Sequence, residues 1–193
     1  MKLGLFGGSF DPPHIGHLLV AIDACEALAL DRLTFIPAGV QPLKAGRAVA
    51  SPSQRYEMVR RLVGSDPRFT VDAIEIERPG LSYTVDTLAT VAARETGSEL
   101  FLLVGADILG SFNQWREPGR ILELATLVVL ERSGGGDLPA LPGRSRSLPT
   151  RRIDVSSTEI RARVAAGKSI RGFVPDAVGE FIAAERLYSQ GTA

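Results

Sequence analysis

The sequence predicts an α/β protein with a Rossmann-like, doubly wound parallel sheet in a single domain. Short apolar runs of strand length alternate with longer segments of helical periodicity, which is typical of strands joined by crossover helices. A glycine-rich turn follows the first apolar run and opens a helix, and another glycine follows the most apolar run, at 100–104. At 193 residues, the chain is long enough for one core of ordinary size.

Composition and charge narrow the class of partner. Hydrophobic residues make up 45% and charged residues 23%, an ordinary globular balance. The 22 basic and 22 acidic side chains cancel, which argues against a nucleic-acid surface or a polybasic membrane anchor. No apolar run is long enough to span a bilayer and no signal pattern appears at the start, so we expect a cytoplasmic protein. Cys25, the only cysteine, is expected to be a buried thiol in the first helix.

The first elements form a strand–helix–strand unit. The apolar runs at 3–6 and 33–36 predict strands, and residues 18–30 between them predict a helix. Such a unit forms a right-handed crossover in a parallel sheet. The Pro- and Gly-rich loop at 37–46 leaves the carboxyl end of the second strand, where open sheets bind ligands. Lys44 is therefore a candidate phosphate contact, with a solvated loop lysine as the alternative.

Two helices and a third strand are predicted in the middle of the chain. Residues 51–63 predict a helix, because a Ser-Pro-Ser start precedes apolar residues on one face. Residues 69–72 predict a strand, which 74–77 would extend past a kink. Another helix follows, with Ser82 or Thr84 as its expected cap.

Residues 100–104 predict a central strand that is buried on both faces. Gly105 directly after it lets a ligand approach the backbone, and the carboxylate of Asp107 can accept a hydrogen bond from a ribose hydroxyl. A simple N-cap is the alternative for Asp107. We expect this strand and the first one to flank the topological switch point, so that the turns at 7–10 and 105–107 face each other across one cleft.

The last part of the chain, at about 156–190, is predicted to be helical. A short helix and a strand precede residues 133–150, whose Gly, Pro, Ser and Arg content indicates a mobile surface loop, and 151–155 predicts an extended segment. Ser157 and Arg161 share one helix face at a helix start, where an anion is favourable. A capped surface helix with a solvated arginine is the alternative.

Both histidines of the chain, His14 and His17, lie in the turn after the first strand. Their spacing at a helix start directs the two rings to the same side, and the amides there attract anions. A dinucleotide-binding fingerprint is a poorer match, because its third glycine is missing. A metal hydrolase would need a third ligand, for which Asp11 is the candidate.

Residues 7–17, G-G-S-F-D-P-P-H-I-G-H, resemble the signature of the nicotinate-nucleotide adenylyltransferase family in the nucleotidylyltransferase superfamily. Residues 156–161, S-S-T-E-I-R, resemble the second motif of that family, and its Ser-Tyr-Thr and Gly-x-Asp stretches match 82–84 and 105–107. Leu43 departs from the pattern, because the family usually has His there. The resemblance implies transfer of the adenylyl group of ATP to nicotinate mononucleotide in NAD biosynthesis, with release of pyrophosphate.

The resemblance also implies roles for individual residues. The expected catalytic residues, which stabilise charge on the triphosphate, are His14, His17 and Arg161. The expected ATP-binding residues are Gly7, Gly8, Ser9, Phe10, Lys44, Gly105, Asp107, Ser157 and Thr158. The expected residues for nicotinate mononucleotide are Thr84, Trp115, which would stack on the nicotinate ring, and Arg116. Mg²⁺ is expected to arrive with the ATP phosphates rather than in a cage of protein ligands.

Alternatives exist within and outside the transferase class. Phosphopantetheine adenylyltransferase, or another nucleotidyltransferase with the H-x-G-H turn, would use the same first motif. A non-catalytic nucleotide-binding module is the alternative from a different class. The residues leave open the choice between nicotinate and nicotinamide mononucleotide, and they leave open the oligomeric state, for which a homo-oligomer is one option.

Overall fold

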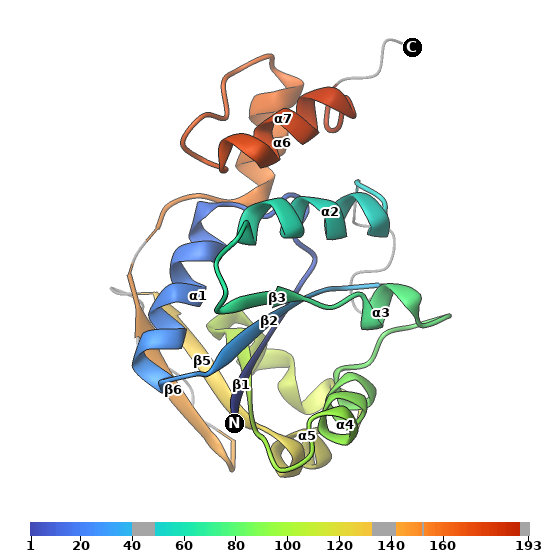
Figure 1. The fold of residues 1–193 in the computed structure, drawn as a ribbon, viewed down its shortest axis with the longest axis vertical. Helices are drawn as coiled ribbons and strands as arrows, with labels where there is room; N and C mark the ends of the chain where they lie inside the picture. The colour runs from blue at the N-terminus through green and yellow to red at the C-terminus, as the bar shows by residue number, and fades with distance from the viewer. Residues whose placement is uncertain (40–48, 133–141, 152, 190–193) are drawn as a thin grey trace.

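The structure, a computed structural model, describes residues 1–39, 49–132, 142–151 and 153–189. Within these ranges, the core is a six-stranded sheet in which every neighbouring pair of strands is parallel (Figure 1). The order across the sheet is β3 (Phe69–Val71), β2 (Arg32–Pro37), β1 (Lys2–Gly8), β4 (Glu99–Gly105), β5 (Thr126–Arg132) and β6 (Ser145–Thr150). The predicted doubly wound parallel sheet is therefore confirmed.

Helices cover both faces of this sheet (Figure 1). One face carries α1 (Ile15–Leu28) and α2 (Pro52–Val63), with α6 (Ser157–Ala165) and α7 (Asp176–Ala184) beyond α2. The other face carries α3 (Ile74–Glu77), α4 (Thr84–Arg94), the 3₁₀ helix η1 (Ala106–Gln114) and α5 (Pro118–Leu124). Each face has its own cluster of buried apolar side chains, as expected for a sheet between two helical layers.

Strand β4 is buried on both faces, as predicted. Leu102 joins the apolar cluster under α4, while Phe101 and Leu103 join the cluster under α1. Strand β1 pairs with β2 on one side and with β4 on the other. The order of the strands reverses between β1 and β4, so the switch point lies between them, also as predicted. The carboxyl ends of β1 and β4 therefore lie at the switch point, where open sheets of this kind bind their ligands.

Two predictions about individual segments are wrong. Residues 74–77 form helix α3 instead of extending β3, because Asp72 Oδ1 accepts from the amide of Ile74 at 2.9 Å and turns the chain. Residues 145–150, predicted to lie in a loop, form strand β6. Its parallel pairing with β5 supplies backbone hydrogen bonds and buries Leu148, which outweighs the loop-like composition.

The expected cap of α4 is also wrong. The N-cap residue is Tyr83, and no side chain caps the helix there. The hydroxyl of Ser82 instead donates to the backbone carbonyl of Glu75 at 3.2 Å, and Thr84 is the first helical residue. Ser82 therefore ties the segment before α4 to α3 rather than satisfying the amides of α4.

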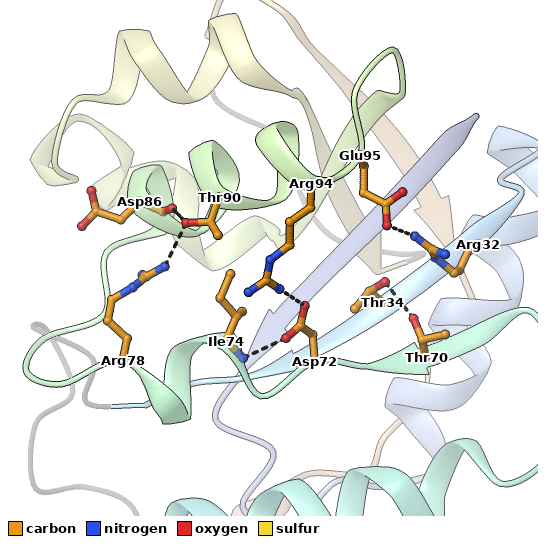
Figure 2. Close-up of polar contacts among 10 residues, drawn as sticks. All are labelled: Arg32, Thr34, Thr70, Asp72, Ile74, Arg78, Asp86, Thr90, Arg94 and Glu95. Atoms are coloured by element: carbon orange, nitrogen blue, oxygen red, sulfur yellow. Dashed lines mark hydrogen bonds and ion pairs between the residues drawn. The ribbon is translucent and has the colours of Figure 1, made fainter.

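Polar contacts connect β2, β3 and α4 around a hollow of about 240 Å³, and Figure 2 shows these contacts. The contacts are Arg32 with Glu95, Arg94 with Asp72 at 3.2 Å, and Thr34 with Thr70 at 2.9 Å. Leu3 of β1 and Arg32 of β2 line this hollow, so it lies toward the amino ends of these two strands, away from the switch point at their carboxyl ends. Among the described residues, no helix is both long and apolar enough to cross a membrane. Cys25 is buried in α1, as predicted.

Candidate nucleotide-binding site

The turn after β1 folds tightly around the ring of Phe10. This residue has a left-handed backbone conformation, with φ of 48°, and its side chain is buried. A Cβ atom on Gly8 would come within 2.9 Å of the Phe10 ring, so only glycine fits at that position. The ring meets that of His17 edge to face at 5.0 Å. Phe10, expected to bind ATP, therefore packs against the ring of His17, and its own side chain is buried.

The two histidine rings lie against each other, with centroids 3.8 Å apart and planes tilted by 33°. The backbone N–H of His14 donates to His17 Nδ1 at 3.2 Å, so a neutral His17 ring carries its proton on Nε2. A Cβ atom on Gly16 would lie 2.9 Å from His14 Nδ1. The glycine of the H-x-G-H pattern therefore makes room for the first imidazole.

The start of α6 meets this turn, as the sequence predicts. Ser156 is the N-cap, and its hydroxyl accepts from the amide of Glu159 at 3.1 Å. Ser157 Oγ donates to the carbonyl of Pro12 at 2.8 Å, and Arg161 Nη1 donates to the carbonyl of Asp11 at 2.7 Å. Residues from the two sequence motifs thus form one polar cluster at the start of two helices.

Asp11 is buried and joins three segments of the chain. Its Oδ2 accepts from the amide of Val49 at 2.7 Å, and its Oδ1 accepts from the amide of Ala50 at 3.1 Å and from the hydroxyl of Tyr188 at 2.7 Å. A metal hydrolase would need this carboxylate as its third metal ligand, but here both of its oxygens accept hydrogen bonds from protein donors. Among the described residues, no group of three His, Cys, Asp or Glu side chains could hold a metal ion.

Arg55 is a site residue that sequence reasoning missed. Its guanidinium is buried and donates to the carbonyl of Ser9 at 2.8 Å and to that of Ala38 at 2.6 Å, which links the loops after β1 and β2. Burial lowers its pKa, and the charge of Asp11 opposes that effect. A signal was available, because Arg55 stands three and four residues before the buried Met58 and Val59 on one face of α2.

The turn after β4 places Asp107 at the carboxyl end of this strand, beside the switch point. The N-cap of η1 is Gly105, so Asp107 is not the N-cap. A Cβ atom on Gly105 would lie 2.5 Å from Asp107 Oδ1, which shows that the exposed carboxylate folds back over the glycine. The pair lies at the carboxyl end of β4, next to β1.

A third group gathers at the start of α4. The guanidinium of Arg116 lies 4.9 Å from the centre of the Tyr83 ring, and its Nη1 is 3.5 Å from Asp86 Oδ2. Trp115 is half-buried and packs against Phe112 at 5.7 Å. These contacts bring Trp115 and Arg116 close to Thr84, the first residue of α4.

Gly39, directly after β2, packs against α3 and the segment before α4. A Cβ atom on Gly39 would come within 2.3 Å of the Glu75 carbonyl and 2.7 Å of Ser82 Oγ. Arg55 donates to the carbonyl of the neighbouring Ala38, so residues 38 and 39 connect the turn after β1 with the segment before α4. Lys44 and Leu43, which lie further along the chain, are outside the described residues.

Fold and site together define the chain as a nucleotidyltransferase of the cytidylyltransferase-like class, whose family model matches residues 5–163. It is 49% identical to a probable nicotinate-nucleotide adenylyltransferase of Gemmatimonas aurantiaca, over 98% of this chain and 93% of the relative. It is 45% identical to the protein of that name in Thermus thermophilus, over 97% of this chain and 100% of the relative. The chain therefore belongs to the nicotinate-nucleotide adenylyltransferase family.

Solved structures share the fold. A nicotinic acid mononucleotide adenylyltransferase of Plasmodium falciparum, complexed with NaAD, aligns with a TM-score of 0.77 over 97% of both chains at 16% identity. A putative nicotinate-nucleotide adenylyltransferase of Vibrio parahaemolyticus aligns with a TM-score of 0.71 at 20% identity, over 99% of this chain and 98% of that one. At these identities the likeness concerns the arrangement of the elements.

Proposed function

We propose that this chain transfers the adenylyl group of ATP to nicotinate mononucleotide, giving nicotinate adenine dinucleotide and pyrophosphate in NAD biosynthesis. The family supports the reaction. The observation that carries the assignment to this site is the junction of α6 with the histidine turn, where Arg161 lies 2.7 Å from the Asp11 carbonyl. Two helix starts, two imidazoles and a guanidinium meet there, a combination suited to a triphosphate.

The chemistry requires alignment more than proton transfer. The attacking group is a phosphate oxygen of the mononucleotide, which is ionised near neutral pH and needs no general base. It forms a bond to the α-phosphorus of ATP, while the bond from that phosphorus to the oxygen bridging to the β-phosphate breaks and pyrophosphate leaves. The protein has to hold the two phosphates in line and neutralise their charge.

We assign the catalytic role to His14, His17 and Arg161. The imidazoles would donate to the α-phosphate and the bridging oxygen, where charge develops, and His17 would do so through Nε2, because its Nδ1 accepts from the His14 amide. Arg161, with Ser157 and Thr158, would hold the β- and γ-phosphates. Because Arg161 donates to Thr158 Oγ1 at 3.2 Å as well as to the Asp11 carbonyl, binding of a phosphate would exchange bonds to neutral acceptors for bonds to an anion.

The remaining ligand contacts follow from the positions of the turns. The backbones of Gly7, Gly8, Ser9 and Phe10 would face the nucleotide, and Asp107, with Gly105, would accept from a ribose hydroxyl. The pyridine nucleotide would be bound by Trp115, Thr84 and Arg116. Arg116 would leave its contact with Asp86 and bind the carboxylate of the nicotinate ring. The contact of Lys44 with a phosphate stays a prediction.

Mg²⁺ fits this site as a companion of the triphosphate. The carboxylate of Asp11 is engaged by three donors, so the phosphates and water would supply the ligands of the ion. When bound, the ion neutralises part of the phosphate charge. The cytoplasmic location and a homo-oligomeric state stay predictions.

Pyrophosphate release tests the proposal directly. Purified protein with ATP and Mg²⁺ is given nicotinate mononucleotide, nicotinamide mononucleotide or phosphopantetheine in separate reactions, and His17→Ala is the matched control. We expect release with nicotinate mononucleotide, lowered on the order of a hundredfold or more in the variant. Release only with phosphopantetheine would favour the other adenylyltransferase, and no release with any acceptor would favour a binding module.

A further inference from the structure

The segment after α7 returns to the histidine turn. Tyr188 follows the last helix, and its hydroxyl donates to Asp11 Oδ1 at 2.7 Å across 177 positions of the chain. Both residues are buried, with 8% of Tyr188 and 4% of Asp11 exposed. A hydrogen bond between a buried hydroxyl and a buried carboxylate is costly to lose, because the remaining partner keeps its desolvation penalty.

Asp11 is the point through which this contact reaches the site. Its carboxylate also accepts from the amides of Val49 and Ala50, which precede α2. Arg55 on α2 holds the carbonyl of Ser9, two residues before Asp11. The Asp11 side chain therefore fixes the turn from within, three residues before His14.

The C-terminal part also holds the same turn through hydrogen bonds to backbone groups of residues 11, 12 and 15. Ser157 and Arg161 donate to the carbonyls of Pro12 and Asp11, and the amide of Ile15 donates to the Phe173 carbonyl at 2.9 Å. If Arg161 binds phosphate through the N–H group that now reaches the Asp11 carbonyl, this bond is exchanged for one to the phosphate. The bond from Tyr188 to the carboxylate is made by a different atom and is unaffected by that exchange.

We propose that Tyr188 is a positioning residue for adenylyl transfer, which through Asp11 keeps the turn carrying His14 and His17 in place while Arg161 engages the phosphates. This role rests on the proposed function. Burial and the bond to Asp11 raise the pKa of the Tyr188 hydroxyl well above its usual value, so it stays a donor throughout the neutral pH range.

The test compares Tyr188→Phe, which removes this hydroxyl, with Tyr56→Phe, which removes a half-buried hydroxyl from α2. The chain has 2 His, the N-cap of α1 and its third residue, so a tag-free protein gives imidazole NMR signals from the site alone. In the substrate-free protein, we expect Tyr188→Phe to move both signals and their titration midpoints, and Tyr56→Phe to leave them in place. Asp11→Asn tests the same contact from its other end and should displace the same signals.

Kinetics give the second readout. With both variants folded in urea titrations, kcat of Tyr188→Phe should fall about tenfold, the size expected when one hydrogen bond to a charged group is lost, while KM for the mononucleotide stays unchanged. Imidazole signals and kcat that match wild type in folded Tyr188→Phe would overturn the positioning role. A wild-type chain that releases no pyrophosphate would defeat the proposed function, whereas the imidazole signals test the turn in either case.

Discussion

Replacing Gly16 by alanine should lower the rate of catalysis while leaving the stability of the fold almost unchanged. The new Cβ atom would lie 2.9 Å from His14 Nδ1 and 3.0 Å from Cε1, whereas comfortable contacts begin at about 3.5 Å. The imidazole therefore has to move by roughly 0.5–1 Å. Because a misplacement of about 1 Å in a reacting constellation can cost on the order of a hundredfold, we expect kcat to fall by about ten- to a hundredfold.

The stability of the same variant should hardly change. The atoms that the methyl group meets belong to a side chain that can rotate, at a cost of about 1 kcal/mol. Alanine in a helix gains up to about 1 kcal/mol over glycine, and Gly16 is the second residue of α1. The two terms oppose each other, so the free energy of unfolding should stay within about 1 kcal/mol of wild type.

Gly119→Ala is the matched control, because Gly119 is the second residue of α5 and a Cβ atom there meets nothing within 4 Å. Pyrophosphate release at saturating substrates gives kcat, and urea unfolding followed by Trp115 fluorescence gives the stability. The control should keep its activity. Full activity in Gly16→Ala, or a loss of activity that merely follows a loss of stability, would show that the glycine does not serve to place His14.

Three further predictions concern charge and burial. Arg161→Ala should lower kcat/KM for ATP on the order of a hundredfold, whereas Arg163→Ala on the same helix should leave it unchanged. Equal losses in the two variants would refute the proposed contact of Arg161 with phosphate. Burial raises the pKa of Glu75, so the contribution of this carboxyl group to the free energy of unfolding is fully present below pH 4.5 and is lost as pH rises through the folded pKa. In urea titrations, Glu75→Gln should therefore become more stable relative to wild type between pH 4 and 7. A difference in stability that does not change with pH would contradict this. Burial raises the pKa of Cys25 to about 11 from 9.0, so iodoacetamide at pH 8 should react about a hundredfold more slowly with folded than with unfolded protein, and equal rates would be inconsistent.

The parts of the fold that could be predicted are those that depend on local pattern. The apolar run at 100–104 indicated a central strand because a strand buried on both faces has no polar alternation. Residues 74–77 were missed because their structure depends on one side-chain bond from Asp72, and residues 145–150 were missed because theirs depends on pairing with β5. Neither cause appears in the local periodicity.

The residues of the candidate site also fall into those that a sequence motif predicted and those that no motif predicted. The histidine pair and Arg161 were found because each belongs to a motif, and the switch-point topology explains how they meet. Tyr188 and Arg55 belong to no motif, and their partners are carbonyls and a carboxylate far away in the sequence. Contacts of this kind become visible only when the chain is folded.

The junction between Asp11 and the C-terminal part also has a consequence for biosynthesis. A ribosome synthesises the chain from its amino end, so the strands β1, β2 and β4 can assemble before Arg161 and Tyr188 have been made. An incomplete polypeptide therefore presents the imidazoles without the guanidinium and phenol that complete their surroundings. If Arg161 holds the phosphates as proposed, nascent chains that stall before these two side chains are made should bind little ATP and transfer no adenylyl group.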